Sequence, residues 1–143
     1  MQLTKFTDFS LRVLLYLAVN DETKATVAVL AEQLQASQNH MVKVVNRLAH
    51  LGYVETTRGS GGGVRLARAP EGIRLGQVIR DTESNLNMVD CSSPPCPVAN
   101  GCRLVPILAE SVNLFLDNLD RYTLQDLIKD NPPLHTTLRV VGG

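Results

Sequence analysis

The sequence contains no tryptophan, and aromatic side chains make up only 4% of its 143 residues. Hydrophobic residues nevertheless reach 44%, so we expect a core built mostly from leucine, valine, isoleucine and alanine. Long hydrophobic runs are missing too, because the apolar stretch 11–19 is too short to span a bilayer and contains Arg12. The first residues lack the charged and then apolar pattern of a secretion signal. We therefore expect a cytoplasmic protein without a membrane span.

A net charge is also missing, since 14 basic and 14 acidic residues cancel. The two signs are unevenly distributed along the chain: residues 1–80 carry ten Lys and Arg against six Asp and Glu, whereas residues 81–143 carry four against eight. The N-terminal part therefore has an excess of positive charge, which favours contact with a polyanion such as DNA. The acidic C-terminal part is expected to have a different role.

Apolar spacing and capping residues predict the order of elements along the chain. The first helix is expected over 8–19 with Thr7 or Asp8 as its cap, the second after a cap at Thr26, and the third from a cap at Ser37 to Leu51, before Gly52. The apolar face of the third helix is expected to consist of Met41, Val42, Val45, Leu48 and Leu51. Two extended segments, 53–57 and 64–66, flank a tip with four glycines.

The remaining elements are a short helix over 73–80, an irregular segment over 81–102, a long helix over 103–122 and a short helix over 123–129. The apolar stripe of the long helix is predicted to be Leu104, Leu108, Val112, Phe115, Leu119 and Tyr122. This order predicts a mainly α fold with a small β-hairpin wing, that is, a winged helix-turn-helix followed by a long dimerisation helix. The expected division is a DNA-binding domain (1–80), a cysteine-bearing loop (81–102), a dimerisation helix with a short C-terminal helix (103–131) and a tail (132–143).

The third helix and the glycine-rich hairpin predict binding to DNA. In a helix-turn-helix the N-terminal residues of the second helix read base edges in the major groove, and glutamine and asparagine pair well with adenine. The residues predicted to contact DNA are Ser37, Gln38, Asn39, His40 and Lys43 on the helix, with Arg58, Gly59 and Arg65 on the wing. Polar surface residues and glycine-rich tips also occur in protein-interaction modules, so each residue taken alone has a plain alternative as a solvated side chain.

Cysteine is scarce, but its three occurrences form a C-x4-C-x5-C array: Cys91, Cys96 and Cys102. Three thiols within a short proline-containing loop can converge on one centre, and iron–sulfur clusters are held by thiolates from such loops. Zinc is less favoured because its paired C-x2-C ligands are absent. A metal-free thiol–disulfide sensor is the other alternative, and three unrelated cysteines are the simplest one.

Several segments together resemble one group of known regulators. They are residues 1–8 with Leu11-Arg12, 39–43, 51–54, 58–59, 62–67 and 122–127, together with the cysteine array. These segments are similar to those of the NsrR repressors, which belong to a family of winged-helix iron–sulfur regulators that also includes IscR. The resemblance extends over the chain to Leu134.

The resemblance implies a homodimer that binds a palindromic operator and represses genes for nitric oxide detoxification. It implies a cluster, [4Fe–4S] or alternatively [2Fe–2S], held by Cys91, Cys96 and Cys102 and by Asp8 of the partner subunit. The IscR arrangement, with a histidine three residues after the last cysteine, is not matched because Val105 stands there. As a hypothesis of mechanism, nitric oxide dismantles the cluster and releases Asp8 to Arg12, which makes Arg12 the candidate switch residue.

Asp8 also has simpler explanations, because an acid in the first turn of a helix favours the helix dipole and can pair with Arg12 at i,i+4. Asp90, beside Cys91, is a competing oxygen ligand. No catalytic constellation is evident around the histidines His40, His50 and His135, so we expect a regulator and not an enzyme. An electron-transfer or cluster-carrier protein is the alternative in a different functional class.

Overall fold

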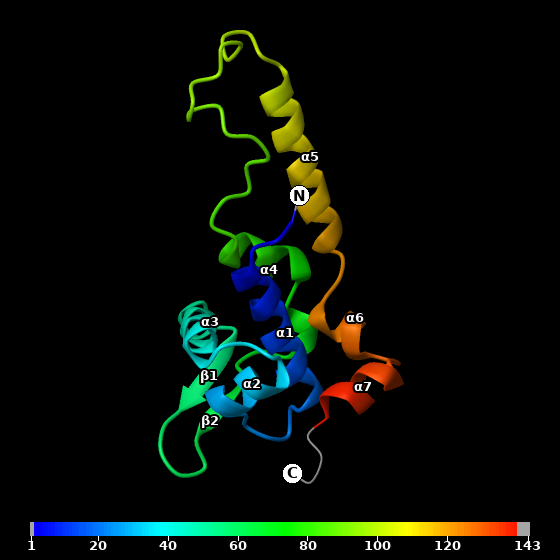
Figure 1. Cartoon of the computed structure of the whole chain (residues 1–143). Coiled ribbons are helices and arrows are strands. Elements are labelled where there is room, and N and C mark those ends of the chain that lie inside the picture. Colours follow the sequence, from blue (N-terminus) through cyan, green and yellow to red (C-terminus); the bar gives the residue numbers. More distant parts are fainter. Residues whose placement is uncertain (1, 140–143) are drawn as a thin grey trace.

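The computed structural model describes residues 2–139 and confirms the expected fold class, with helices throughout and one two-stranded antiparallel hairpin in this part of the chain (Figure 1). Its elements are α1 (Lys5–Val19), α2 (Val27–Gln33), α3 (Gln38–His50), β1 (Val54–Thr57), β2 (Gly63–Leu66), the 3-10 turn η1 (Pro70–Gly72), α4 (Leu75–Thr82), α5 (Leu104–Leu119), α6 (Leu124–Ile128) and α7 (Pro132–Leu138). Residues 140–143 of the expected tail lie outside the described residues.

Side-chain caps define where the N-terminal helices begin. Thr26 accepts a hydrogen bond from the backbone N–H of Val29, and Ser37 caps α3 as the sequence predicts. The predicted start of the first helix is wrong, because α1 begins at Lys5 with Thr4 as its cap. The carboxylate of Glu83, at the end of α4, accepts from the backbone N–H of Thr4 at 3.2 Å. This contact between distant parts of the chain holds Thr4 in the capping position.

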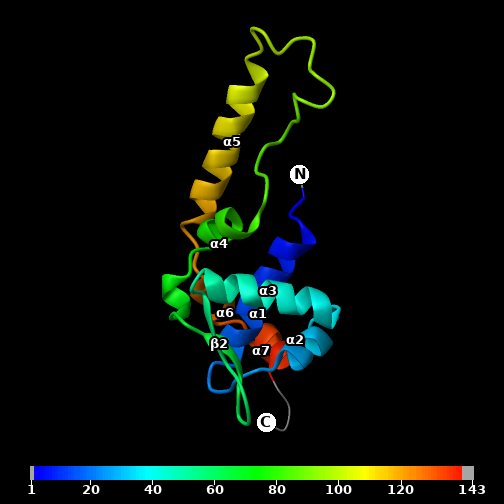
Figure 2. The same cartoon turned by 90° about the vertical axis from the view of Figure 1, so that its left-hand side faces the viewer.

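Helices α2 and α3 form the helix-turn-helix over an aliphatic core. The turn between them contains Gln35, whose φ of 55° places it in the left-handed region. The apolar face of α3 differs from the prediction in one position: Val44 is fully buried, whereas Val42 is 39% exposed. Helix α1 packs directly against α3 (Figure 2), as does α2, and the packing of these neighbours decides which of the two valines is covered.

The wing is a short hairpin in which Val54 pairs with Leu66 and Thr57 with Gly63. Its base is extended by a bridge to Ala25, whose N–H donates to the carbonyl oxygen of Val64 at 3.0 Å. At the tip, a Cβ added at Gly62 would collide with the backbone oxygens of Thr57 and Gly59, so only glycine allows this tight turn. The hairpin is thereby fixed to the body next to α3.

Helix α5 projects from the body, and the segment between α4 and α5 runs alongside it to the far end, where the cysteine loop lies (Figures 1 and 2). The base of α5 is held against α4 by Arg80, which pairs with Asp117 at 2.9 Å and with Asp120 at 2.8 Å. The predicted stripe of α5 is only partly correct: Val112 and Leu116 are its buried residues, and Phe115 is 41% exposed. Buried residues are confined to the half of α5 that meets α4.

The C-terminal elements return to the body. Leu124 and Ile128 of α6 belong to the same buried cluster as the core residues of α1 and α3. The predicted tail is helical in part, because Asn131 caps α7 and Pro132 occupies its first position. Proline suits the first turn of a helix, since its missing N–H is not needed there.

Candidate DNA-binding surface and cysteine loop

The first turn of α3 presents polar groups to solvent. Ser37 accepts from the backbone N–H of His40 at 3.1 Å, and Gln38 and Asn39 are exposed beside it. Lys43, one turn further, is also exposed. Because Met41 and Val44 hold the opposite face in the core, these three side chains are fixed on an outward surface from which they can donate to bases or phosphates.

His40 lies differently from its predicted role. Its imidazole ring packs edge-on against two rings of α1, with centroids 6.2 Å from Phe6 and 5.4 Å from Phe9. Nε2 of His40 is buried and has no hydrogen-bond partner among the described residues. The ring therefore faces α1 and not the outward surface of α3, and a base contact through Nε2 stays a prediction that this arrangement does not favour.

Two further residues belong to the outward surface of α3 but were not predicted from the sequence. Val42 and Asn46 are exposed and follow Gln38 and Asn39 by helical spacing. Asn46 lines a cleft of about 380 Å³ between α3 and the wing, together with Arg58 and Gly59. The signal was present as the i, i+4 spacing from Gln38, but Val42 had been assigned to the core because it is apolar.

The arginines of the wing have different partners. Arg58 and Gly59 are exposed at the tip, where the glycines let the backbone approach a groove. Arg65 is exposed and pairs with Glu55 across the hairpin at 3.2 Å, so a phosphate would have to compete with this carboxylate. Arg68 lies over the ring of Tyr53, 4.4 Å from its centroid, and donates to the carbonyl oxygens of Leu51 and Gly52. Its role is to hold the wing to α3.

The cysteine loop brings the three thiols into one neighbourhood. Cys91, Cys96 and Cys102 are free and partly buried, and the backbone N–H of Cys96 donates to the carbonyl oxygen of Cys91 at 3.0 Å. Partial burial, and then the nearby thiols of Cys96 and Cys102 and the charge of Asp90, raise the pKa of Cys91. Within residues 2–139, however, no three Cys, His, Asp or Glu side chains come together closely enough to hold a metal ion.

The two predicted oxygen ligands have partners of their own. Asp8 accepts from Nε of Arg12 at 2.9 Å on the surface of α1, and it is not brought to the cysteines of the same chain. Asp90 accepts from the hydroxyl of Ser92 at 2.6 Å and from its backbone N–H at 2.9 Å, and these bonds lower the pKa of Asp90. Within one chain, the structure thus brings the thiols near each other but leaves Asp8 apart from them.

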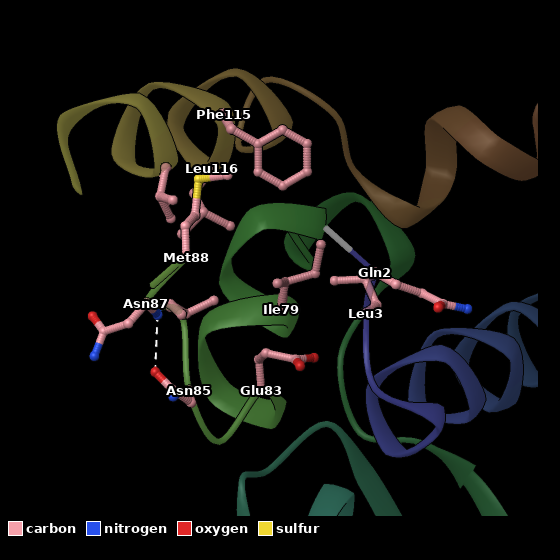
Figure 3. Close-up of a pocket in the computed structure, with 11 residues that line it drawn as sticks. Gln2, Leu3, Ile79, Glu83, Asn85, Asn87, Met88, Phe115 and Leu116 are labelled. Atoms are coloured by element: carbon pink, nitrogen blue, oxygen red, sulfur yellow. Dashed lines mark hydrogen bonds between the residues drawn. The ribbon is translucent and has the colours of Figure 1, made fainter. Parts of the chain in front are cut away.

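A pocket of about 280 Å³ opens beside the base of α5, as Figure 3 shows. Its floor is apolar and includes Leu3, Ile79 and Leu116, which form a small second core. Phe115 and Met88 also line it, and their side chains are partly exposed. The pocket therefore continues the exposed apolar surface of α5.

That surface extends along α5 away from the body. Leu104, Ile107 and Leu114 are 55%, 57% and 62% exposed, respectively. Contiguous exposed apolar residues of this size on a projecting helix are typical of a protein–protein contact. None of the described helices is both long and apolar enough to cross a membrane.

Comparison with known proteins places these features in a known group. Residues 3–130 match the profile of the Rrf2 family, described as iron-dependent transcriptional regulators. The fold is similar to that of CymR, the global cysteine regulator of B. subtilis, with 21% identity, a TM-score of 0.73 and coverage of 92% of this chain and 98% of that one. IscR of T. potens matches with 23% identity and a TM-score of 0.70, covering 91% and 88% of the two chains. The oxidized form of Staphylococcus aureus CymR matches with 22% identity and a TM-score of 0.72, and the match covers 92% of this chain and 98% of that one.

Proposed function

Because this chain belongs to the Rrf2 family of transcriptional regulators, we propose that it is a homodimeric repressor that senses nitric oxide through an iron–sulfur cluster. As a regulator, it acts by binding DNA in the cytoplasm and not as an enzyme. We keep the division expected from the sequence as part of the proposal: DNA binding in 1–80, the cluster in 81–102, dimerisation in 103–131 and a tail over 132–143, of which 132–138 form α7.

The observation that carries the DNA-binding part is the outward surface of α3 next to the wing. Gln38 and Asn39 are exposed on the first turn and Lys43 on the next, and Arg58 with Gly59 stands across the cleft from Asn46. The helix fits the major groove, where amide side chains discriminate bases, and the wing tip fits the neighbouring minor groove, where arginine senses groove width. Ser37 and Arg65, also predicted from the sequence, are proposed as phosphate-binding residues.

The exposed apolar side of α5 supports the homodimer. Two copies that cover Leu104, Ile107 and Leu114 against each other would remove these side chains from water, which is favourable in proportion to the area buried. Two-fold symmetry then requires a palindromic operator, with the α3 helices about 34 Å apart, one turn of DNA.

The donor set fits an iron–sulfur cluster. Cys91, Cys96 and Cys102 supply three thiols from one loop, and thiolates are the usual ligands of such clusters. We propose a [4Fe–4S] cluster, with [2Fe–2S] as the alternative, and Asp8 of the partner subunit as the fourth ligand. When bound, the cluster supplies iron to which nitric oxide can bind.

The residues of this chain then determine how the signal reaches DNA. Asp8 has two partners available, the loop of the other subunit and Arg12 of its own helix, and the latter is the one seen in this structure. In the proposal, Arg12 holds Asp8 only when the cluster does not. The two arrangements place α1 differently relative to the partner subunit, so the spacing of the two α3 helices fits the operator in only one of them.

A metal-free thiol regulator is the second candidate. The three thiols are free and lie near each other, and one of the similar structures is the oxidized form of S. aureus CymR. In this alternative, a disulfide within the loop would replace the cluster as the signal.

Anaerobically purified protein tests the proposal. We expect iron and sulfide in the wild type, sequence-selective DNA binding, and a loss of about 10³-fold in selective affinity after nitric oxide at one salt concentration. Cys96→Ala is expected to lose the iron, and Asp8→Ala to change the visible spectrum or the rate of reaction with nitric oxide. Iron-free protein whose selective binding responds only to disulfide reagents would support the thiol regulator instead.

A separate variant tests the DNA contacts. Gln38→Ala should weaken binding to the selected sequence by about tenfold while leaving binding to unrelated DNA unchanged, because one bidentate base contact is lost. Gln77→Ala, an exposed glutamine of α4 outside this surface, is the matched control. Equal loss on selected and unrelated DNA would mean that Gln38 contacts no base.

A further inference from the structure

A chain of four side chains connects the surface of α1 to the first turn of α3. It begins with Asp8, which holds Nε of Arg12 at 2.9 Å. The guanidinium carbon of Arg12 lies 5.4 Å from the ring centroid of Phe9. The ring of Phe9 meets that of His40 at 5.4 Å with an interplanar angle of 72°. Each member therefore touches the next, and the last one belongs to the turn that carries Gln38 and Asn39.

The imidazole of His40 acts here as an aromatic packing group. Phe6 contacts it from the preceding turn of α1, with an interplanar angle of 85°, so two rings surround it edge-on, a favourable geometry for aromatic pairs. One of its two ring nitrogens, Nε2, is buried and, within the described part of the chain, has no hydrogen-bond partner, so this nitrogen is not open to a groove. Its backbone N–H meanwhile donates to Ser37 Oγ, which ties the ring to the cap of α3.

Buried polar side chains of α1 lie next to the two phenylalanines. Thr7 and Ser10, on the same helix, are fully buried, and the hydroxyl of Ser10 donates to the carbonyl oxygen of Phe6 at 2.7 Å. Figure 2 shows α3 lying against α1, and the two helices pack directly. Arg12 and His40 therefore contact the same aromatic ring, that of Phe9, from α1 and α3 respectively.

We propose that His40 is a positioning residue, which sets the place of the first turn of α3 and transmits the state of the Asp8–Arg12 pair to it through Phe9. This inference rests on the proposed function and specifies its regulation. It also assigns His40 a role different from the base contact expected from the sequence. Gln38 and Asn39 contact the DNA, and His40 determines where they stand.

The test compares variants of the full-length protein on two short duplexes, one carrying the sequence that the wild type selects from a random library and one with that sequence scrambled. His40→Ala should lower the ratio of the affinity for the selected duplex to that for the scrambled duplex by about tenfold. This is the effect expected from the loss of aromatic contacts of this kind. His40→Phe, which keeps an aromatic ring but no ring nitrogen, should restore the ratio to within about threefold of the wild type. His50→Ala, an exposed histidine at the other end of α3, is the control.

A double-mutant cycle tests the link to Arg12. Arg12→Ala and His40→Ala should combine non-additively, because removing either one interrupts the same contact chain. Additive effects, within about twofold, would overturn the transmission through Phe9. Loss of selectivity in His40→Phe equal to that in His40→Ala would overturn the positioning role and restore the base contact.

Thermal unfolding separates these results from a folding defect. If His40→Ala does not fold, His40→Phe and Phe9→Leu replace it in the test. Phe9→Leu leaves His40 unsubstituted and is expected to lower the affinity ratio. An unchanged ratio in Phe9→Leu would contradict the proposal. If the wild type selects no DNA sequence, the proposed function fails. If the wild type selects a sequence and the His40 variants select it equally well, only the positioning role of His40 fails.

Discussion

Side chains around the wing differ in whether they hold the fold or stay free for a partner. Arg68 stacks on Tyr53, whose hydroxyl donates to Asp81 at 2.6 Å and so joins α3, the wing and α4. Lys43 and Arg58, in contrast, form no ion pair within residues 2–139 and remain exposed. The same basic residue type thus serves packing at one position and is available to phosphates at another, because only Arg68 has an aromatic face and two carbonyl groups within reach.

The Tyr53–Asp81 contact predicts a dependence of stability on pH. Burial, and then the hydrogen bond to Asp81 and its charge, raise the pKa of Tyr53. Since the folded-state pKa lies above the unfolded value of about 10, this contribution is complete below pH 10 and is lost as the pH rises further. We expect the free energy of unfolding of Tyr53→Phe to fall less steeply above about pH 10 than that of the wild type, as measured by denaturant unfolding.

At neutral pH the same substitution should cost about 1–2 kcal/mol, because Asp81 loses a buried donor. Tyr122→Phe is the matched control, since Tyr122 is 45% exposed and its hydroxyl forms no hydrogen bond within the described residues. A Tyr53→Phe protein with the stability and alkaline profile of the wild type would contradict the assigned role of the hydroxyl.

Among the helices, the close approach of α4 and α5 depends on one small residue. A Cβ at Gly76 would meet the carboxylate of Asp120 and lie 2.5 Å from the carbonyl oxygen of Leu116. Glycine therefore lets the two helices approach until Arg80 reaches Asp117 and Asp120. The base of α5 is positioned by this contact, and the direction in which the cysteine loop projects follows from it.

Gly76→Ala should consequently destabilise the protein by about 1–3 kcal/mol, the usual cost of overpacking, despite the better helix propensity of alanine. Denaturant unfolding measures this loss. Gly72→Ala is the control, because a Cβ there would have no atom within 4 Å and Gly72 does not require a left-handed backbone. If Gly76→Ala is as stable as the wild type, α4 and α5 can move apart without loss of stability. The close approach of the two helices would then not contribute to stability.

For the molecule as a whole, the main feature is a division between a body with a complete core and a projecting helix without one. Helices α1, α3 and α6 share one buried cluster, whereas α5 buries only Val112 and Leu116. A helix with apolar residues exposed along its length is not stable in water by propensity alone and needs a packing partner. In the proposal, a second copy supplies it.

Leu114→Glu tests whether a second copy covers the exposed apolar side of α5. Because Leu114 is 62% exposed in the single chain, the charge should leave the fold intact but prevent two apolar faces from meeting, so the protein should become monomeric in sedimentation experiments. Asn113→Glu adds the same charge at a neighbouring exposed position and should remain dimeric. A dimer that persists in Leu114→Glu would place the subunit contact elsewhere on the molecule.

Much of the fold could be predicted from the sequence because its signals are local. Thr26 and Ser37 cap the helices as expected, and a tight glycine turn joins two strands into the wing. Caps and turns depend on residues within a few positions of each other, so a single sequence contains all the information they need. The helix-turn-helix, the wing and the long helix follow from these rules, and so does the set of residues from which the candidate site was chosen.

The tertiary structure decided what depends on distant neighbours. Thr4 caps α1 with the help of Glu83, Val44 and not Val42 is buried in the core, and His40 turns its ring toward two phenylalanines. None of these choices is visible in local spacing, because the burial of one face of a helix is determined by whatever packs against it. The sequence by itself determined most of the elements, although not α7, and most of the candidate side chains, although not Val42 and Asn46. The packing between elements determined which of those side chains face outward, where a ligand can reach them.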